Sequence, residues 1–441
     1  MADRASPRAL AIEVLARVRA TDAYLSRVLD AALAEHQPDD PRDAALVTEL
    51  CYGSTRRELG LDWAIERHSD RKLDRLEDRV LAALRVGAYQ LFFTRIPRHA
   101  AVRETVEALK AVGVGRAAGF ANAVLRKLAA DEALPLPPES DRVRHLAVRE
   151  SHPDWLVRRW IARYGEARAE KMLEADNQPA PLCVRVNSSK LSRDELLAQF
   201  VEAGLAAKAT ALSPVGLLLP PAGRVDELFG FAEGLWQVQD EAAQLVALFA
   251  AVDPGKRVLD ACAAPGGKAC HLAERNPVVA IDVHPHKLRK IEAEASRLGL
   301  TARLSAVGHD ATLPLPTALG AFDAVLLDAP CSGLGTLRRH PELKARRAEG
   351  DLARLVELQS SLLARCAEAV PPGGTLTYAV CSPEPEEGQD QVERFLGQHP
   401  GFASQPPAWP YPLKLEDGFF CTLPGPEGTD GFFAARLARR C

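Results

Sequence analysis

The sequence lacks several features that would assign it to particular protein classes. None of its nine cysteines forms a Cys-x-x-Cys pair, so a structural zinc site has no support. No apolar run reaches the roughly 18–20 residues that span a bilayer. The polar stretch Met1–Ala11 has no apolar segment behind it that would make a signal peptide. These absences predict a cytoplasmic protein with no membrane partner and no bound metal.

The chain also has little excess charge, with 55 Lys and Arg against 59 Asp and Glu and a net charge of −4. That balance is not typical of a nucleic-acid-binding protein, but the charge is unevenly distributed. Residues 71–127 hold twelve basic and five acidic residues, a local net of +7, so the remainder carries −11. Such a basic block can bind phosphates locally, or its arginines can simply solvate helix faces. The charge count leaves both interpretations open.

Hydrophobic patterning divides the 441 residues into three expected domains, in line with a prior of about 150 residues per domain. Residues 1–135 are expected to form an all-α helical bundle, because apolar residues recur at helical spacing and alanine is abundant. Residues 142–235 combine strands at 182–186 and 215–219 with a helix at about 193–203. This pattern predicts a small α/β domain.

In residues 236–441, short apolar strands alternate with helices, which predicts an α/β domain with a parallel, doubly wound sheet. The expected strands are 257–260, 278–282, 302–307, 324–328 and 375–380, with a last pair, 418–422 and 431–437, as a hairpin at the sheet edge. Ligands bind at the carboxyl ends of the strands in such sheets. The residues that follow the strands are therefore the site candidates.

A loop of small residues follows the first of these strands, with the sequence Asp260-Ala-Cys-Ala-Ala-Pro-Gly-Gly-Lys268. Its glycines let the backbone approach a ligand closely, although it matches neither common phosphate-loop pattern. Asp282 ends the next strand and suits the hydroxyls of a ribose, while a role in capping the helix at Pro285 is equally compatible. Asp310, in the next connection, is a candidate for an adenine edge.

Two cysteines also follow strands. Cys331 belongs to Asp328-Ala-Pro-Cys331, and Cys381 follows the strand 375–380. Neighbouring strands lie about 4.8 Å apart, so both thiols would face one pocket if these two strands pair. A lone buried cysteine is usually structural. Two of them at strand ends, beside a nucleotide-type loop, favour catalysis.

These motifs together resemble the RNA 5-methylcytosine methyltransferases of the Nol1/Nop2/Sun family. The matching pieces span nearly all of residues 235–441 and are Gln239–Val246, Asp260–Lys268, Asp282, Asp310, Leu327–Gly333, Tyr378–Ser382, Glu386-Glu387 and Thr429–Phe433. Three further stretches, Ser151–Leu156, Arg185–Asn187 and Arg338–Lys344, are similar to the bacterial Sun/RsmB-type branch of the family.

The resemblance implies a NusB-like helical RNA-binding domain, a small α/β linker domain and a Rossmann-like class I methyltransferase domain. It implies S-adenosylmethionine as cofactor and 16S ribosomal RNA as partner, and we expect a monomer. It assigns the nucleophile to Cys381, product release to Cys331 and a contact with the cytosine to Asp328. We expect Lys268 to orient either Asp328 or the backbone of the site. The residues expected to hold the cofactor are Cys262, Ala263, Ala264, Pro265, Gly266, Gly267, Lys268, Asp282, Asp310 and Asp328.

Some alternatives stay open at this point. The same chemistry could act on transfer RNA or on another ribosomal RNA site, or the chain could be an RNA-binding assembly factor with an inactive methyltransferase fold. Methylation of an amino group is disfavoured by Cys331, because those enzymes carry a polar-Pro-Pro-aromatic motif and need no thiol.

The chain departs from the family pattern at Ala379-Val380, where Ser-Thr is common, and at Gly388, where Asn is common. These changes are expected to alter the packing around Cys381. A free thiol has a pKa of about 8.5 and needs activation at neutral pH, for which His340 and Lys268 are the candidates.

Overall fold

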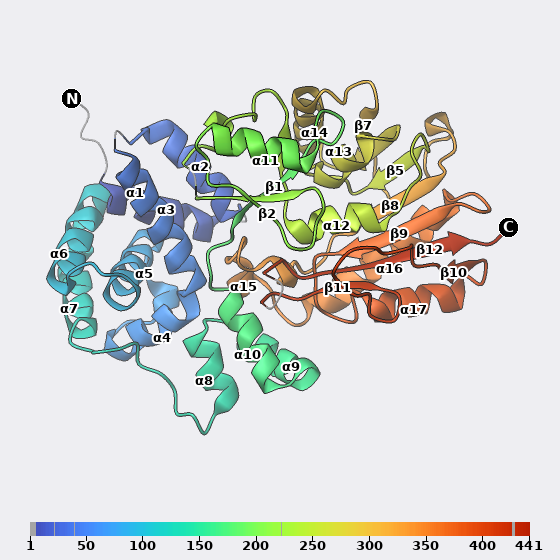
Figure 1. Ribbon diagram of the computed structural model, residues 1–441. Coiled ribbons are helices and arrows are strands. Elements are labelled where there is room, and N and C mark those ends of the chain that lie inside the picture. Colours follow the sequence, from blue (N-terminus) through green and yellow to red (C-terminus); the bar gives the residue numbers. More distant parts are fainter. Residues whose placement is uncertain (1–5, 22, 39, 222, 426–427) are drawn as a thin grey trace. The chain divides into compact units, whose positions relative to one another are not determined.

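The computed structural model describes residues 6–21, 23–38, 40–221, 223–425 and 428–441 (Figure 1). The first five residues of the polar N-terminal stretch lie outside the described residues. By its internal contacts the chain divides into two compact units. We call them the helical unit, Met1–Pro179 with Leu337–Arg347, and the sheet unit, Ala180–Thr336 with Ala348–Cys441. Within the described ranges, no helix is both long and apolar enough to cross a membrane.

The helical unit contains helices and, among its described residues, no strand. Its apolar residues at helical spacing are buried, as Leu10, Val14 and Val18 show in α1, so the expected all-α bundle is confirmed. Its helices are α1 Pro7–Ala20, α2 Leu25–His36, α3 Pro41–Arg56, α4 Glu58–His68, α5 Asp78–Phe93, α6 Arg98–Leu109, α7 Ala118–Leu128, α8 Arg142–Arg149, α9 Asp154–Tyr164, α10 Glu166–Ala175 and α15 Leu343–Arg346.

The segment Leu337–Arg347 belongs to the helical unit although it lies late in the sequence. The carboxylate of Glu342 accepts the backbone N–H of Leu25 at 3.2 Å, across 317 positions of sequence. The ammonium of Lys344, which is buried, donates to Oδ1 of Asn177 at 2.8 Å, across 167 positions. These long-range bonds explain why no local sequence pattern revealed this packing.

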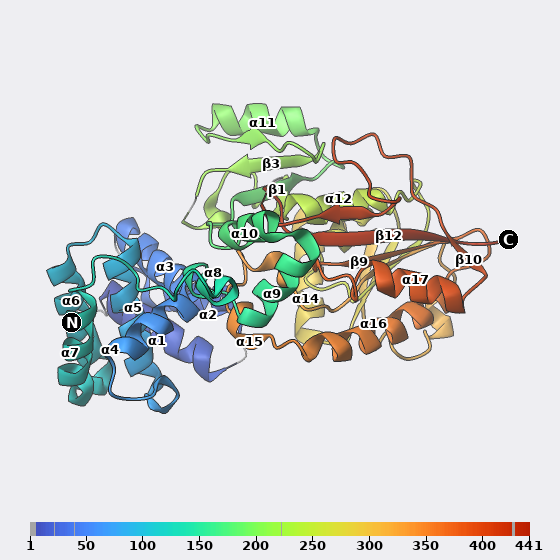
Figure 2. The same ribbon diagram turned by 90° about the horizontal axis from the view of Figure 1, so that it is seen from below.

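The sheet unit contains a small antiparallel sheet of order β2-β3-β1-β4, which α11 (Arg193–Glu202) covers (Figure 2). The two expected strands form as β1 (Leu182–Val186) and β3 (Gly216–Leu219), and they pair with each other. The short strands β2 (Lys208–Ala209) and β4 (Trp236–Val238) flank them. A small α/β element is therefore present, as the pattern predicts.

The main sheet has the order β10-β12-β9-β8-β5-β6-β7, and its strands from β9 to β7 are parallel. This confirms the expected parallel sheet. Its strands are β5 Val258–Ala261, β6 Val278–Asp282, β7 Leu304–Gly308, β8 Ala324–Asp328, β9 Thr375–Val380, β10 Phe402–Ser404, β11 Phe420–Thr422 and β12 Phe432–Arg439.

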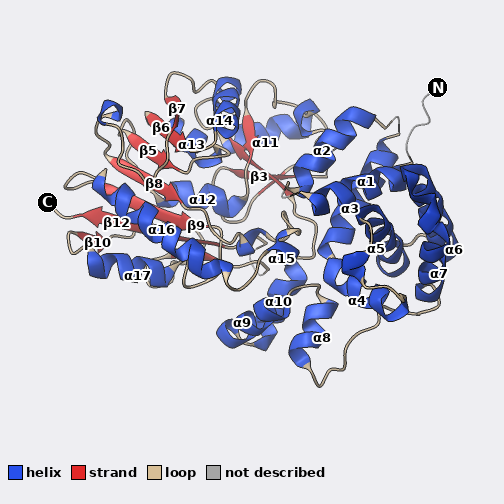
Figure 3. Cartoon of the chain, turned by 180° about the vertical axis from the view of Figure 1, so that it is seen from behind, coloured by secondary structure: helices blue, strands red, loops and turns tan. Residues whose placement is uncertain are grey.

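Two apolar layers cover the faces of the main sheet (Figure 3). Because side chains alternate along a strand, Val258 packs in one layer and its neighbour Leu259 in the other. The first layer includes α12 Glu241–Phe249, α13 Gly267–Ala273 and α14 Pro285–Leu298, and the second includes α16 Asp351–Glu368 and α17 Gln389–Gln398. The sheet is thus doubly wound, as expected.

The C-terminal strands differ in one detail from a simple edge hairpin. β11 and β12 do pair antiparallel, but β12 is eight residues long and β11 only three. One edge of β12 pairs with β9, and its other edge pairs first with β11 and then with β10. β12 is therefore an interior strand, because its extra length leaves hydrogen-bonding groups that β10 satisfies.

Candidate active site

The expected site residues follow neighbouring strands of the main sheet. Since β6, β5, β8 and β9 are adjacent and parallel, their carboxyl ends meet at one edge. The loop Cys262–Lys268 follows β5, Asp282 ends β6, Asp310 lies beyond β7, Asp328 ends β8, and Cys331 and Cys381 follow β8 and β9.

The two cysteines face each other, with their sulfur atoms 3.2 Å apart. The pairing of β8 with β9 produces this approach, because it sets Asp328 opposite Ala379 and ties the next backbone N–H to Ala379 at 2.9 Å. The hydrogen bond with Cys381 and burial together raise the pKa of the Cys331 thiol well above its ordinary value. Cys331 is therefore the thiol that keeps its proton.

The loops that carry the two thiols are joined through the serines that follow them. The hydroxyls of Ser332 and Ser382 lie 3.1 Å apart. The buried carboxylate of Glu387 accepts the backbone N–H of Ser332 at 2.8 Å and its hydroxyl at 2.5 Å. The same carboxylate accepts the side-chain amide of Gln359 at 3.0 Å. Glu387 thus anchors the Cys331 loop beside the Cys381 loop.

Sequence reasoning did not assign a role to this anchor. Glu387 belonged to a matched pair of glutamates, which was the available signal for it. Gln359 offers no signal at all, because it lies within the long helix α16 and its burial becomes visible only in the fold.

A charged pair lies next to the thiols. The ammonium of Lys268 donates to Oδ2 of Asp328 at 2.6 Å. Burial alone would lower the pKa of Lys268, but the adjacent Asp328 outweighs it and the pKa lies above its ordinary value. Lys268 therefore stays protonated. The Cys381 sulfur acts on the pKa of Lys268 in the same direction, so these two side chains lie close enough to interact electrostatically.

The carboxyl group of Asp260 lies near the end of β5, just before the loop Cys262–Lys268, which we call the glycine loop. It is 0% exposed, and neither of its oxygens has a hydrogen-bond partner among the described residues. Burial, together with the nearby charge of Asp328, raises its pKa well above the ordinary value. Buried polar groups are normally hydrogen-bonded, so this carboxyl fits the polar part of a ligand in the loop. The sequence motif contains Asp260, but its pattern alone does not identify this residue as part of the site.

The glycine loop owes its shape to residues with positive φ angles. Cys262 has a φ of 59° and Gly266 a φ of 105°, the latter in a conformation that side chains rarely allow. A Cβ atom on Gly266 would also lie 3.1 Å from Ile291 of α14. The loop is therefore a close-packed turn between β5 and α13, as the small residues predict.

Asp282 and Asp310 make local hydrogen bonds. Oδ1 of Asp282 accepts the backbone N–H of His284 at 2.9 Å, but His284 is itself the N-cap residue of α14, so the prediction that Asp282 caps this helix is wrong. Oδ1 of Asp310 accepts both the hydroxyl and the N–H of Thr312, which lower the pKa of that carboxyl. Their part in holding a cofactor stays a prediction.

The departure from the family pattern at Gly388 has a visible counterpart. A Cβ atom at Gly388 would lie 3.0 Å from the ring of Phe433, which occupies the space of a side chain there.

Of the two candidates for activating Cys381, only Lys268 lies in the sheet unit. His340 belongs to the helical unit, where its ring packs 4.9 Å from Tyr24 and burial lowers its pKa to about 4.

Comparison with known proteins supports a methyltransferase. Three family models match the chain: 16S rRNA methyltransferase RsmB/F over residues 247–438, the NusB family over 5–130, and the ferredoxin-like domain of RsmF/B-like methyltransferases over 152–226. The protein named ribosomal RNA small subunit methyltransferase B of Klebsiella pneumoniae is 37% identical and covers 100% of both chains. Its namesake from Vibrio cholerae is 38% identical over 98% of this chain and 97% of its own.

Solved structures agree with this result. The crystal structure of PH0851 matches with a TM-score of 0.86 and 25% identity over 98% of this chain and 99% of its own. NSun6 from Pyrococcus horikoshii, solved with SFG, shows the same fold over 66% of this chain and 99% of its own, with a TM-score of 0.58 and 20% identity. On the strength of full-length relatives at more than 30% identity, the chain belongs to the RsmB/F family of 16S rRNA methyltransferases, with a NusB-family domain at its N-terminal end.

Proposed function

We propose that the protein transfers a methyl group from S-adenosylmethionine to carbon 5 of a cytosine in 16S ribosomal RNA, through a covalent adduct with Cys381. The observation that carries the proposal is the pair of thiols 3.2 Å apart, beside the Lys268–Asp328 pair, in a methyltransferase fold. Methylation of an amino group would need no thiol. Addition of a thiolate to carbon 6 is what makes carbon 5 of a cytosine nucleophilic.

The residues of the glycine loop fit the cofactor. Asp260 offers a buried carboxyl that lacks a partner among the described residues, and Gly266 leaves the turn without a side chain. We assign the cofactor to the loop Cys262–Lys268 with Asp282, Asp310 and Asp328, because these residues follow adjacent strand ends. When bound, S-adenosylmethionine supplies the methyl group that carbon 5 accepts. The structure of NSun6 with SFG, an analogue of this cofactor, supports the assignment.

The two thiols take different roles. We assign Cys331 as the donor in the hydrogen bond between the two sulfurs, because its pKa is raised, and the charged Lys268 lies within electrostatic reach of Cys381. Cys381 is therefore the thiolate that forms the bond to carbon 6. Asp328 contacts the amine edge of the cytosine and keeps the charge of Lys268 next to the ring, where negative charge develops.

Release of the methylated RNA requires that the bond between carbon 6 and the sulfur of Cys381 breaks. The proton on carbon 5 leaves, its electron pair restores the ring double bond, and the bond from carbon 6 to Cys381 breaks to give back the thiolate. We assign proton removal to Cys331, after its own proton has passed to solvent. Bonding of Cys381 to the ring removes the hydrogen bond that contributes most to the raised pKa of Cys331. The acid–base role of Cys331 is thus coupled to the covalent state of Cys381.

The base must leave its stack to expose carbon 6, which favours a loop or single-stranded target. A groove of about 800 Å³ between α6 and α7 of the helical unit offers a surface for such RNA. Its lining includes Arg98, His99, Arg103, Lys110 and Arg126, which belong to or adjoin the basic block 71–127. We propose residues 1–135 as an RNA-binding domain, 142–235 as a small linker domain and 236–441 as the catalytic domain.

Analysis of the modified nucleoside tests this proposal. The protein is incubated with S-adenosylmethionine and 16S transcript, and the digested RNA is analysed by mass spectrometry. The expected product is 5-methylcytidine, absent with Cys381→Ala. A parallel reaction on transfer RNA tests the substrate class. Methylation of an amino group, or equal activity of Cys381→Ala, would contradict the proposal.

A further inference from the structure

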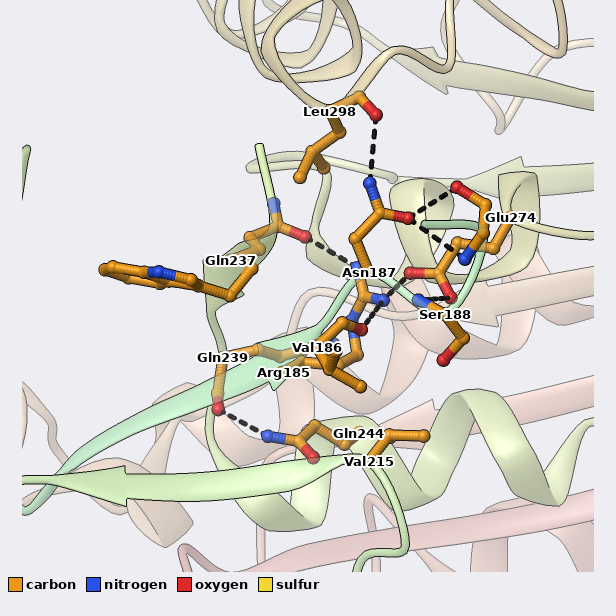
Figure 4. Close-up of polar contacts among 12 residues, drawn as sticks. Arg185, Val186, Asn187, Ser188, Val215, Gln237, Gln239, Gln244, Glu274 and Leu298 are labelled. Carbon is orange, nitrogen blue, oxygen red and sulfur yellow. Dashed lines mark hydrogen bonds and ion pairs between the residues drawn. The ribbon is translucent and has the colours of Figure 1, made fainter. Parts of the chain in front are cut away.

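Arg185 of β1 is a wholly buried arginine that the proposed mechanism does not use. It is 0% exposed, and its guanidinium makes four polar contacts. Figure 4 shows the cluster of residues to which it belongs. Nε donates to Oε1 of Gln239 at 2.7 Å, Nη2 to Oε1 of Gln237 at 3.0 Å, and Nη1 to the carbonyl of Val186 at 3.2 Å. Nη1 also forms an ion pair with Glu274.

Two of these partners lie at opposite ends of α13. Glu274 is the residue that caps the C-terminal end of this helix. Gln239 packs at the other end, because its side-chain amide lies 3.4 Å from where a Cβ atom of Gly267 would be. Gly267 is the first residue of α13 and the second glycine of the loop. One side chain therefore connects both ends of the helix that follows the loop.

The physical setting makes this connection rigid. α13 has only seven residues, too few to be stable without packing partners. Burial lowers the pKa of Arg185 to about 10, so its guanidinium is still charged at neutral pH. A buried charge must keep its partners, since leaving it unpaired is very costly. The second oxygen of Glu274 accepts the backbone N–H of Ser188 at 3.0 Å, which fixes that carboxylate too.

We propose that Arg185 is a positioning residue for the cofactor site: by holding Glu274 and Gln239, it fixes α13 and thereby the conformation of the glycine loop. This inference rests on the proposed function, which places the cofactor in that loop. It assigns the small sheet that contains β1 a part in cofactor binding. Misplacing a reacting group by about 1 Å can lower a reaction rate by about two orders of magnitude. We expect a comparable displacement of the glycine loop to weaken cofactor binding about 10–100-fold when Arg185 is lost.

The test measures binding of S-adenosylhomocysteine by calorimetry for Arg185→Met and Gln239→Ala. Asn187→Ala is the matched control, because Asn187 lies two residues away and donates to the carbonyls of Gly234 at 3.0 Å and Leu298 at 2.9 Å. It removes buried hydrogen bonds from the same region without touching α13. Both test variants raise the Kd at least about tenfold, and the control raises it less than about threefold.

Thermal denaturation of each variant separates positioning from folding. If Arg185→Met does not fold, Gln239→Ala, which keeps the charge pair, carries the test. The combined variant loses less binding energy than the sum of the single ones, since both act through one contact. In turnover assays the KM for S-adenosylmethionine rises by a larger factor than kcat falls, because Lys268 of α13 is still held by its ion pair with Asp328. Folded variants with the wild-type Kd overturn the inference, whereas a wild type that binds no S-adenosylhomocysteine overturns the proposed function instead.

Discussion

Glu387 gives the account a quantitative test, because its carboxylate accepts three buried donors. They are the N–H and hydroxyl of Ser332, at 2.8 and 2.5 Å, and the amide of Gln359, at 3.0 Å. Hydrogen bonds to a charged acceptor contribute about 1.5–3 kcal/mol each, and a buried donor left without an acceptor costs about 1–3 kcal/mol. Glu387→Ala removes the acceptor of all three, but the Ser332 hydroxyl can still bond Ser382, 3.1 Å away, so two donors are stranded at a cost of about 2–6 kcal/mol.

Glu387→Gln is the sharper substitution, since it keeps the shape of the side chain and one acceptor oxygen. It should lower the free energy of unfolding by about 1.5–3 kcal/mol, the value of one such bond. For a unit of this size that corresponds to a fall in Tm of roughly 3–12 °C. Glu393→Gln is the matched control, because Glu393 is exposed on α17 and the same substitution should leave the Tm unchanged.

The same variant should also affect the reaction. Ser332 follows Cys331 directly, so loosening its anchor displaces the thiol assigned to product release. Glu387→Gln should therefore slow release of the methylated RNA more than formation of the adduct, as single-turnover measurements would show. A Glu387→Gln protein that matches wild type in both Tm and release rate would refute the reasoning.

Three further predictions follow from other parts of the molecule. Lys268→Met removes the cation beside Asp328, so the methylation rate at saturating cofactor should fall at least about 100-fold. Lys256 is exposed, and Lys256→Met, the control, should keep the wild-type rate. Arg126→Glu in the α6–α7 groove should weaken RNA binding and reduce the slope of log K against log salt concentration by about one phosphate contact. Arg17→Glu, on the exposed face of α1, should change neither the affinity nor the slope. Burial lowers the pKa of Lys344 to about 7. Between pH 7 and 10.5 the unfolded chain then binds the additional proton, so wild-type stability should rise with pH by up to about 1.4 kcal/mol per unit relative to Lys344→Met. Parallel pH slopes in chemical denaturation would exclude this last prediction.

Much of the fold could be predicted because strong local patterns encode it. The buried strands β5, β6, β8 and β9 are short and largely apolar, and their parallel order follows from the helices that alternate with strands in this domain. The candidate site followed in turn, since ligands gather at the ends of such strands. The expectation that both thiols share a pocket depended on the pairing of β8 with β9, which the structure confirms.

Other features depend on contacts that no local pattern reports. β2, β4 and β10 have two or three residues each, too few for any periodicity. Lys344 lies next to Asn177 only because a late segment joins the helical unit. Arg185 and Glu387 are charged residues that the sequence alone would place at the surface, because only their distant partners make burial tolerable.

The central claim is that Cys381 forms the bond to the cytosine and Cys331 ends it. The most direct test incubates wild type, Cys331→Ala and Cys381→Ala with S-adenosylmethionine and 16S transcript, and then separates protein–RNA adducts on denaturing gels. We expect Cys331→Ala to accumulate a covalent complex and Cys381→Ala to give neither adduct nor methyl transfer. An adduct that accumulates with Cys381→Ala and is lost with Cys331→Ala would contradict it and make Cys331 the nucleophile.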